Sequence, residues 1–221
     1  VPAATVVVGT ATATLSNQVG PKRERVFKSL IFMPMAISFV AASTIWAYFY
    51  SFVPPGRPEV GLLNALVKFF GGEAQPWLTI DQGRLNSFLL MVVIIWLQGG
   101  YAMVVISAAI KNVPAETLEA AQLDGANSWQ VFFRVVLPQV WGTVMSVFVT
   151  ILIMVMKIFD IVLSMTRGNF TTSVLAFEWY KEFFENSNLG PASAVVTILV
   201  VLIAPLMWLQ IRTVRQQESL R

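Results

Sequence analysis

The sequence predicts an all-α fold, a polytopic bundle of transmembrane helices. Of its 221 residues, 56% are hydrophobic and only 12% are charged, which is about half the charged share of an ordinary soluble domain. The apolar residues gather in repeated runs near the roughly 20 residues that carry a helix across a bilayer. We therefore expect about four complete spans, two of them joined by a short helix.

Composition also excludes several classes of chemistry. The chain has no Cys and no His, which excludes disulfides, thiolate or imidazole metal sites and imidazole acid–base catalysis. It also lacks a Gly-rich loop ending in Gly-Lys-Ser/Thr, the usual cradle for ATP phosphates. We predict no catalytic residue, no metal site and no bound cofactor in this chain, so any ATP used with it is hydrolysed by another subunit.

The N-terminal third begins with a short apolar segment, residues 1–16, rich in Ala and Thr. Residues 17–28 carry four basic side chains, which predicts a solvated loop on the cytoplasmic side. Residues 29–53 are expected to form the first complete span, kinked near its start by Pro34. Aromatic residues gather toward its outer end, as at a membrane interface: Trp46, Tyr48 and Tyr50.

Residues 54–85 are expected outside the membrane, because prolines interrupt helix formation at their start. Within them, residues 61–70 have the pattern of a short amphipathic helix lying at the membrane interface, and Gly71 and Gly72 end it. Trp77 is a further candidate interfacial anchor.

The next span, residues 86–110, carries Gln98, Gly99, Gly100 and Tyr101 at its middle. An amide at membrane depth needs a partner or water. In one interpretation the glycines allow close helix packing and Gln98 bonds across it. In the other, Gln98 and Tyr101 line a passage.

Residues 111–138 form the longest polar-rich break in the apolar sequence. Pro114 suits the first turn of a helix, where its missing N–H costs nothing. Gly125 can end that helix in a left-handed conformation. Asn127 with Gln130 three residues later resembles a capping box for a second helix start. The pattern predicts a short helix over about 115–124, projecting between two spans, and Pro138 opens the next apolar run.

The following span, residues 139–165, contains Lys157 and Asp160, which can face each other at three-residue spacing on a helix. A structural ion pair and a role in a passage are both open for them, since charges at membrane depth face protein or water. Residues 179–188 form an external acidic and aromatic stretch, and the last span runs over about 189–210.

The basic residues test this topology. Nine fall in segments assigned to the inside, including Arg212, Arg215 and Arg221, and five fall outside, with Lys157 in the membrane. The excess has the sign expected for cytoplasmic loops. It places residues 111–138 on the cytoplasmic side, within reach of a cytoplasmic ATPase.

The break resembles a signature of the permease subunits of binding-protein-dependent ABC importers. That signature is Glu-Ala-Ala, three residues, Gly, nine residues, Ile, any residue and Leu-Pro. This chain keeps every spacing and replaces Ile by Val: Glu119, Ala120, Ala121, Gly125, Val135, Leu137, Pro138. Two other stretches resemble the sugar-importing branch of these permeases. One is the pattern G-L-x-N-x-L followed by a Gly pair and Trp-Leu, and the other is the run from residues 160 to 172.

The resemblance implies one permease domain over 1–221, N-terminally incomplete, in the inner membrane of a bacterium or archaeon. It implies half of a passage for an oligosaccharide or glycoside, similar to the maltose and α-glucoside class. Expected partners are an identical or different second permease, two ATPase subunits holding Mg-ATP, an external binding protein that delivers the sugar, and membrane lipid, but no nucleic acid. The external segments 54–85 and 167–188 are the expected dock for the binding protein.

Residues 111–138, the EAA loop, are then the contact with the ATPases. The residues expected to couple the ATPases are Glu116, Leu118, Glu119, Ala120, Ala121, Asp124, Gly125, Leu137 and Pro138. The candidates for the substrate path are Gln98, Tyr101, Lys157 and Asp160. The alternatives are an ion-coupled secondary transporter, with Lys157 and Asp160 as its coupling charges, and an ABC permease for a solute other than a sugar.

Overall fold

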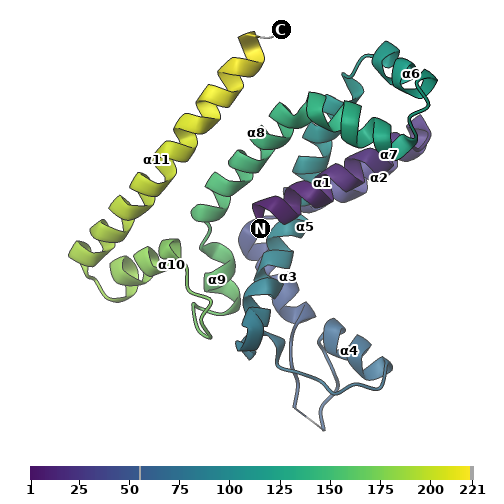
Figure 1. Cartoon of the computed structure of the whole chain (residues 1–221). Coiled ribbons are helices and arrows are strands. Elements are labelled where there is room, and N and C mark those ends of the chain that lie inside the picture. Colours follow the sequence, from purple (N-terminus) through teal and green to yellow (C-terminus); the bar gives the residue numbers. More distant parts are fainter. Residues whose placement is uncertain (55, 220–221) are drawn as a thin grey trace. The chain divides into compact units, whose positions relative to one another are not determined.

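The computed structural model describes residues 1–54 and 56–219, with side chains as far as Arg212. Arg215 and Arg221 of the predicted basic C-terminus therefore lie outside the described side chains. Every regular element of the described residues is helical (Figure 1). The predicted all-α fold class is confirmed.

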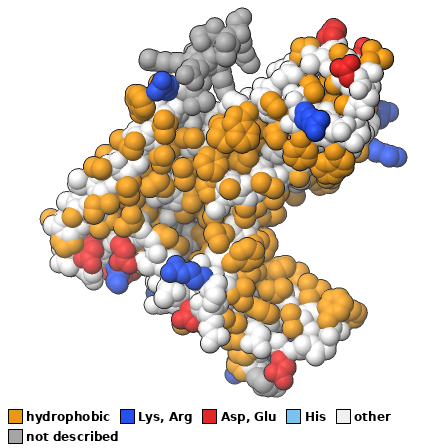
Figure 2. Space-filling view, viewed as in Figure 1, with side chains coloured by type: hydrophobic (Ala, Val, Ile, Leu, Met, Phe, Trp, Pro, Cys, Tyr) orange, Lys and Arg blue, Asp and Glu red, His pale blue; other side chains and the backbone are white. Residues whose placement is uncertain are grey.

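Within the described chain, three helical stretches are long and apolar enough to cross a bilayer: Gln82–Lys111, Ser128–Met156 and Leu189–Arg212. A fourth candidate is a bent pair, Pro21–Ala36 and Phe39–Phe49, whose axes differ by 101°. Leu189–Arg212 is almost entirely exposed, and Figure 2 shows hydrophobic side chains over its visible face. An apolar surface of this extent indicates contact with lipid or with another apolar chain.

The described chain divides into two compact units. The first comprises Val1–Ala36, Ile95–Val155 and Ala204–Arg221, and the second comprises Ile37–Ile94 and Met156–Ile203. The assignment of 1–221 to a single permease domain stays a prediction.

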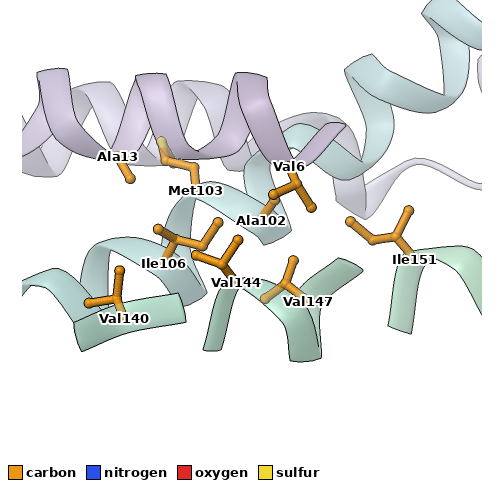
Figure 3. Packing of buried hydrophobic residues seen from close by; sticks show 9 residues of the cluster. All are labelled: Val6, Ala13, Ala102, Met103, Ile106, Val140, Val144, Val147 and Ile151. Carbon is orange, nitrogen blue, oxygen red and sulfur yellow. The ribbon is translucent and has the colours of Figure 1, made fainter. Parts of the chain in front are cut away.

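The first unit is built around a core shared by α1 (Pro2–Asn17), α5 (Leu85–Lys111) and α8 (Leu137–Met156). On α8 the core positions recur at three- and four-residue spacing, so they fall on one face of the helix. Figure 3 shows the nine buried side chains of this core: Val6, Ala13, Ala102, Met103, Ile106, Val140, Val144, Val147 and Ile151.

Two glycines let other helices approach α5 at backbone distance. A Cβ added at Gly100 would lie 2.4 Å from the carbonyl oxygen of Ile31, and one added at Gly9 would lie 2.4 Å from the Cβ of Ala102. A Cβ at Gly99 would make only an ordinary contact, at 3.8 Å. The predicted role of Gly100 in close helix packing is confirmed.

The prediction of a solvated loop over 17–28 is wrong. Helix α1 ends at Asn17, and α2 (Pro21–Phe32) begins four residues later with proline in its first turn. The structural reason is local: proline at the start and Glu24 in the first turn both favour a helix N-terminus. The four basic residues of this segment therefore lie on a helix.

The predicted span 29–53 is broken more sharply than a kink. Helix α2 ends at Phe32, a 3₁₀ turn (η1, Met33–Ala36) carries Pro34, and α3 (Phe39–Phe49) begins after it. The Ser38 hydroxyl accepts a hydrogen bond from the N–H of Ala41 at 3.2 Å. Ser38 therefore caps a new helix instead of continuing the old one.

The second unit contains α3, α4 (Leu62–Phe69), the first part of α5, α9 (Asp160–Met165), α10 (Leu175–Tyr180) and the first part of α11 (Leu189–Ser219). Single turns of helix complete it: η2 (Trp77–Thr79), η3 (Gln82–Arg84) and the π-helical η5 (Lys181–Glu185). Helix α3 packs against α9. The phenol of Tyr50, at the end of α3, donates to the carbonyl of Leu89 on α5 at 3.4 Å, so the end of α3 lies beside the start of α5.

The predicted span 139–165 also differs from the structure. The helix entering it begins at Ser128 and ends at Met156, and a break of three residues separates it from α9. Ile158 within this break is buried. The break therefore turns an apolar side chain inward, which explains why hydropathy alone did not reveal it.

Candidate functional site

The polar break 111–138 folds around a single short helix, α6 (Ala115–Leu123). Pro114 stands at its N-cap position, and Glu116 adds negative charge to the first turn, where the helix dipole favours it. Gly125 follows the C-cap with φ of +83°. The predicted helix and its left-handed glycine are both confirmed.

The C-terminus of α6 is closed by two backbone hydrogen bonds. The N–H of Gly125 donates to the carbonyl of Gln122 at 3.0 Å, and the N–H of Ala126 donates to the carbonyl of Ala121 at 3.1 Å. This pair of bonds is the Schellman motif, which requires a left-handed residue after the C-cap. A side chain at position 125 would therefore strain the closure.

Helix α6 buries none of its side chains. Six of the predicted coupling residues are exposed: Glu116, Glu119, Ala120, Asp124, Gly125 and Pro138. Leu118 and Ala121 are partly buried, and Leu123 is 89% exposed. A capped helix with acidic residues and an uncovered leucine can be contacted by another protein along most of its length.

The second helix start is capped as predicted. The Asn127 side chain accepts from the N–H of Gln130 at 2.9 Å, and the Gln130 side chain accepts from the N–H of Asn127 at 2.8 Å. This reciprocal pair begins α7 (Ser128–Val131) and satisfies two amide groups that the helix itself leaves free.

A π-helical turn (η4, Phe132–Val136) joins α7 to α8. In it the N–H of Leu137 donates to the carbonyl of Phe132, one residue further back than in an α-helix. Pro138 follows directly and has no N–H to continue the α-helical pattern. Pro138 is the second residue of α8 (Leu137–Met156), so it opens this apolar run as predicted, and the π-helical turn just before it joins α8 to α7.

Both ends of the EAA loop are anchored in the first unit. Val113, before α6, and Leu137, after it, pack against the buried core. Val131 and Val136 are themselves buried. The loop is thus an exposed helix held between two fixed ends.

Sequence reasoning missed an aromatic pair beside α6. The rings of Trp129 and Phe133 stack with their centroids 5.7 Å apart and an angle of 7° between their planes, although they are 73% and 53% exposed. The available signal was two large aromatic residues four positions apart in a polar segment. They extend the uncovered apolar surface begun by Leu123.

Gln98 and Tyr101 lie on α5 in the first unit. Gln98 is 9% exposed, and among the described residues no hydrogen bond of its amide is found, so the bond across helices that the packing interpretation required is not formed there. Tyr101 packs against the buried core. Packing accounts for Tyr101, whereas the Gln98 amide keeps its hydrogen-bonding capacity.

Lys157 and Asp160 lie in the second unit, at the break between α8 and α9. Lys157 is exposed, and Asp160 is the first residue of α9. Because the helix is interrupted between them, the expected pairing on one helical face is wrong, and the described residues show no ion pair joining them.

The segment 54–85, predicted to be external, is organised by one buried amide, that of Asn64. The Asn64 amide nitrogen donates to the carbonyls of Ser51 and Gln75 at 2.9 and 3.0 Å. Its oxygen accepts from the N–H of Gln75 and from the indole N–H of Trp77 at 2.9 and 2.8 Å. Asn64 thus binds α4 to the chain on both sides of it, and the predicted amphipathic helix ending at the Gly pair is confirmed.

An ion pair lies at the edge of this segment. Lys68 contacts Glu59 at 2.7 Å. The hydrogen bond from Lys68 holds the pKa of the Glu59 carboxyl below its usual value, because it favours the charged form.

The second external segment contains a tightly closed loop. The buried hydroxyls of Thr166 and Thr172 lie 2.6 Å apart, and the Asn86 amide donates to the carbonyl of Phe170 at 2.6 Å. Arg167 and Phe170 have φ of +52° and +55°, a region costly for residues with side chains. Such a loop persists only where its surroundings fix it.

The acidic and aromatic stretch after this loop is locally bonded. Trp179 stacks on Phe183 with centroids 6.0 Å apart. The Glu182 carboxylate accepts from the amides of Asn186 and Asn188, each at 3.0 Å. Glu182 therefore closes a turn in addition to presenting charge.

Comparison with protein families gives one matching description, "Binding-protein-dependent transport system inner membrane component", over residues 5–215. The alpha-glucoside transport system permease protein AglF of Rhizobium meliloti (strain 1021) is 44% identical over 222 residues, covering 99% of this chain and 64% of AglF. The osmoprotective compounds uptake permease protein GgtC of Synechocystis sp. (strain ATCC 27184 / PCC 6803 / Kazusa) is 44% identical over 216 residues, covering 98% of this chain and 76% of GgtC. The chain thus spans less than two thirds of the length of AglF.

Among solved structures, a bacterial alginate ABC transporter in complex with an alginate pentasaccharide-bound periplasmic protein contains a chain of similar fold. The TM-score is 0.81 and the sequence identity is 21%, and the match covers 96% of this chain and 72% of that one. At this identity the match supports the fold alone.

Proposed function

The chain belongs to the family of binding-protein-dependent transport system inner membrane components, and from this premise we propose that it is the permease subunit of an ATP-driven ABC importer. It is a multi-pass membrane protein and a transport subunit, not an enzyme. In the proposal it forms half of a passage for an oligosaccharide or glycoside in the inner membrane of a bacterium or archaeon. The name of AglF, an alpha-glucoside permease at 44% identity, supports this substrate class.

The observation that carries the proposal is the construction of the EAA loop. Helix α6 buries no side chain, yet its C-terminus is closed by two hydrogen bonds and both flanks of the loop are anchored in the core. A helix built in this way transmits force to the spans that hold it. We assign its surface to two ATPase subunits, which would carry Mg-ATP, and the exposed Trp129 and Phe133 extend that surface.

The absence of Cys from the sequence makes a direct test simple. Gln122→Cys places a single thiol on exposed α6, and Glu73→Cys places one on the external segment as a matched control. In the assembled transporter, a short bifunctional crosslinker should join the ATPase to position 122 and not to position 73. ATP-dependent uptake by proteoliposomes is the accompanying readout. If neither thiol crosslinks to the ATPase, or uptake needs no ATP, the proposal fails.

We propose Gln98 as a residue of the substrate path, with Tyr101, Lys157 and Asp160 as further candidates. Gln98 supports the proposal most directly, because its nearly buried amide has no partner among the described residues. A sugar hydroxyl supplies the donor and acceptor that such an amide needs. Gln98→Leu should change transport rate or sugar preference, and Tyr101→Phe tests the phenol hydroxyl while keeping the packed ring. If Gln98→Leu transports as the wild type does, the role of Gln98 is helix packing and not contact with the substrate.

The external segments 54–85 and 167–188 are the proposed dock for an extracytoplasmic binding protein. Their support is a pre-formed surface: α4 held by Asn64, and the loop closed by Thr166 and Thr172. A second permease subunit, identical or different, completes the proposed passage. Purification of the intact complex, with identification of the binding protein and its ligand, tests these partners and the sugar together.

A further inference from the structure

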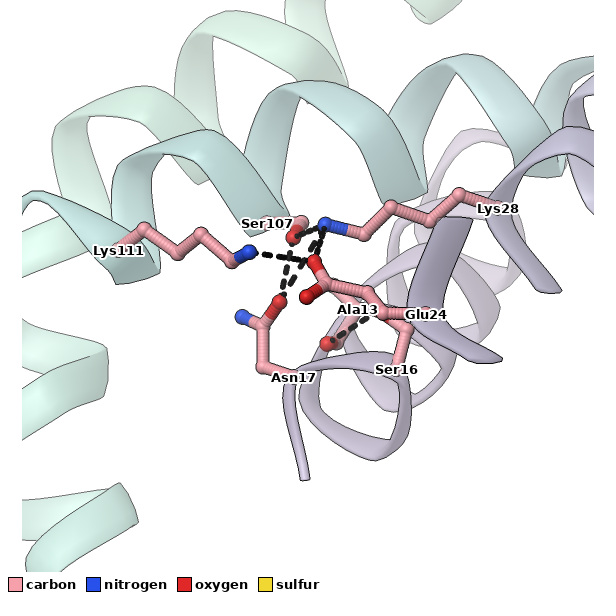
Figure 4. Close-up of polar contacts among 7 residues, drawn as sticks. All are labelled: Ala13, Ser16, Asn17, Glu24, Lys28, Ser107 and Lys111. Carbon is pink, nitrogen blue, oxygen red and sulfur yellow. Dashed lines mark hydrogen bonds and ion pairs between the residues drawn. The ribbon is translucent and has the colours of Figure 1, made fainter. Parts of the chain in front are cut away.

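One carboxylate in the first unit is shared by two ammonium groups (Figure 4). Glu24 contacts Lys28 at 2.6 Å and Lys111 at 2.5 Å. Lys28 also donates to the hydroxyl of Ser107 and lies 3.4 Å from the Asn17 side-chain oxygen. The Ser107 hydroxyl donates to that same oxygen at 2.7 Å.

These five residues come from three helices. Asn17 is the last residue of α1, Glu24 and Lys28 lie one turn apart on α2, and Ser107 and Lys111 lie one turn apart on α5. Since residues four apart share a helix face, α2 and α5 each present a matched pair toward the other. The cluster therefore ties the ends of α1 and α5 to α2.

The burial of the cluster falls off toward the EAA loop. Ser107 is fully buried, the Glu24 side chain is 14% exposed, and that of Lys111 is 51% exposed. Gly100, on the same face of α5, lies against the backbone of Ile31 and so fixes the distance between α2 and α5 at the other end of their contact. The ion pair thus closes one end of a contact whose other end is at backbone distance.

Lys111 occupies a particular place in the chain, because it is the last residue of α5 and only three residues separate it from α6. Any displacement of α6 acts first on this point. We propose that Glu24 and Lys111 are positioning residues that brace the base of the EAA loop against α2. Movement of α6 then reaches α1 and α2 together with α5.

This inference rests on the proposed function and predicts an order of effects. Glu24→Gln removes the shared carboxylate and leaves two cations facing each other, so it should cause the largest defect. Lys111→Gln leaves Glu24 paired with Lys28, so it should release the loop without disturbing the helix pair. Lys22→Gln is the matched control: it is exposed on the same helix, and no ion pair of Lys22 occurs in the described residues. Lys111→Arg keeps the positive charge, so its coupling of ATP hydrolysis to transport should stay near that of the wild type.

The measurement is sugar taken up per ATP hydrolysed, in proteoliposomes that contain the assembled transporter. For Lys111→Gln we expect this ratio to fall by about two- to fivefold, the scale of a partly exposed ion pair, while ATP hydrolysis continues. The Glu24→Gln and Lys111→Gln effects should be less than additive in the double variant, because both remove the same contact. A purely structural role would lower yield and both rates together without changing their ratio.

Wild-type ratios in both Glu24→Gln and Lys111→Gln would overturn the inference. So would full additivity in the double variant, or an equal defect in Lys22→Gln. If Glu24→Gln fails to assemble, Lys111→Gln still decides, because its side chain is half exposed and does not support the core. Failure of the proposed function is distinguishable, since it would appear as absence of ATP-dependent uptake in the unmodified transporter.

Discussion

Replacing Gly125 should separate ATP hydrolysis from transport. This glycine holds φ of +83°, and a Cβ added to it would have no neighbour within 4 Å. The cost of a side chain therefore lies in the backbone conformation alone and not in a collision. For an ordinary L-residue that conformation costs about 1–2 kcal/mol, and a β-branched residue is the least tolerant of it.

Helix α6 has little with which to offset this cost. It is nine residues long and buries no side chain, so its closed C-terminus depends on the two bonds that the left-handed glycine permits. A loss of 1–2 kcal/mol changes the ratio of closed to open ends by a factor of about 5–30. We expect Gly125→Val to lower sugar uptake per ATP by a factor of this order.

The series Gly125→Asn, Gly125→Ala and Gly125→Val provides the control. Asn tolerates the left-handed region better than the other two, so its coupling ratio should stay near that of the wild type, with Ala between Asn and Val. All three should insert and unfold as the wild type does, because position 125 touches no part of the core. A wild-type ratio for Val would refute the reasoning. Equal defects for Asn and Val would show that the ATPase excludes any side chain there, whatever its backbone preference.

Three further predictions concern other parts of the chain. Gly100→Ala should lower the thermal stability of the purified transporter, since its Cβ would lie 2.4 Å from a backbone oxygen, whereas Gly99→Ala, with 3.8 Å of clearance, should not. Because the pKa of Glu59 is lowered, its pairing with Lys68 contributes stability above the ordinary carboxyl pKa of about 4.3 and loses it as pH falls through the lowered value. Lowering the pH from 5 to 3 should therefore lower the thermal unfolding temperature of the wild type more than that of Lys68→Met. Charge reversal of exposed Glu185 should raise the binding-protein concentration that half-saturates ATPase stimulation, and more so at low salt, since rim charges act on encounter rate. If the variant and the wild type have the same half-saturating concentration at both salt levels, Glu185 does not belong to the surface that binds the binding protein.

The parts of the fold that the sequence predicted well are those that depend on neighbours along the chain. The left-handed Gly125 and the reciprocal pair of Asn127 and Gln130 each involve residues within five positions of one another. Helix capping is a local equilibrium between a side chain and the nearest free amides. A pattern read from sequence therefore contains most of the information that determines these features.

The features that the sequence did not reveal are those that depend on distant residues. Lys28 meets Ser107 across 79 positions, and nothing near residues 17–28 signals that partner. The same segment therefore has the composition of a solvated loop and the structure of a helix tied to α5. The break after Met156 was missed for a related reason: the spacing of Lys157 and Asp160 also fits one continuous helix, and the burial of Ile158 between them depends on tertiary packing.

The two external motifs that resemble sugar permeases have a structural role in this chain. An amide has two donor and two acceptor positions, and Asn64 uses all four on Ser51, Gln75 and Trp77. Thr166 and Thr172 are buried and bonded to each other. Asn64 therefore has no hydrogen-bonding capacity left for a sugar hydroxyl, and burial withholds the two threonines from one. In the proposed sugar importer, both motifs would build the scaffold of the segments predicted to be external, and Gln98, whose amide has no partner among the described residues, is the side chain to test first for sugar selection.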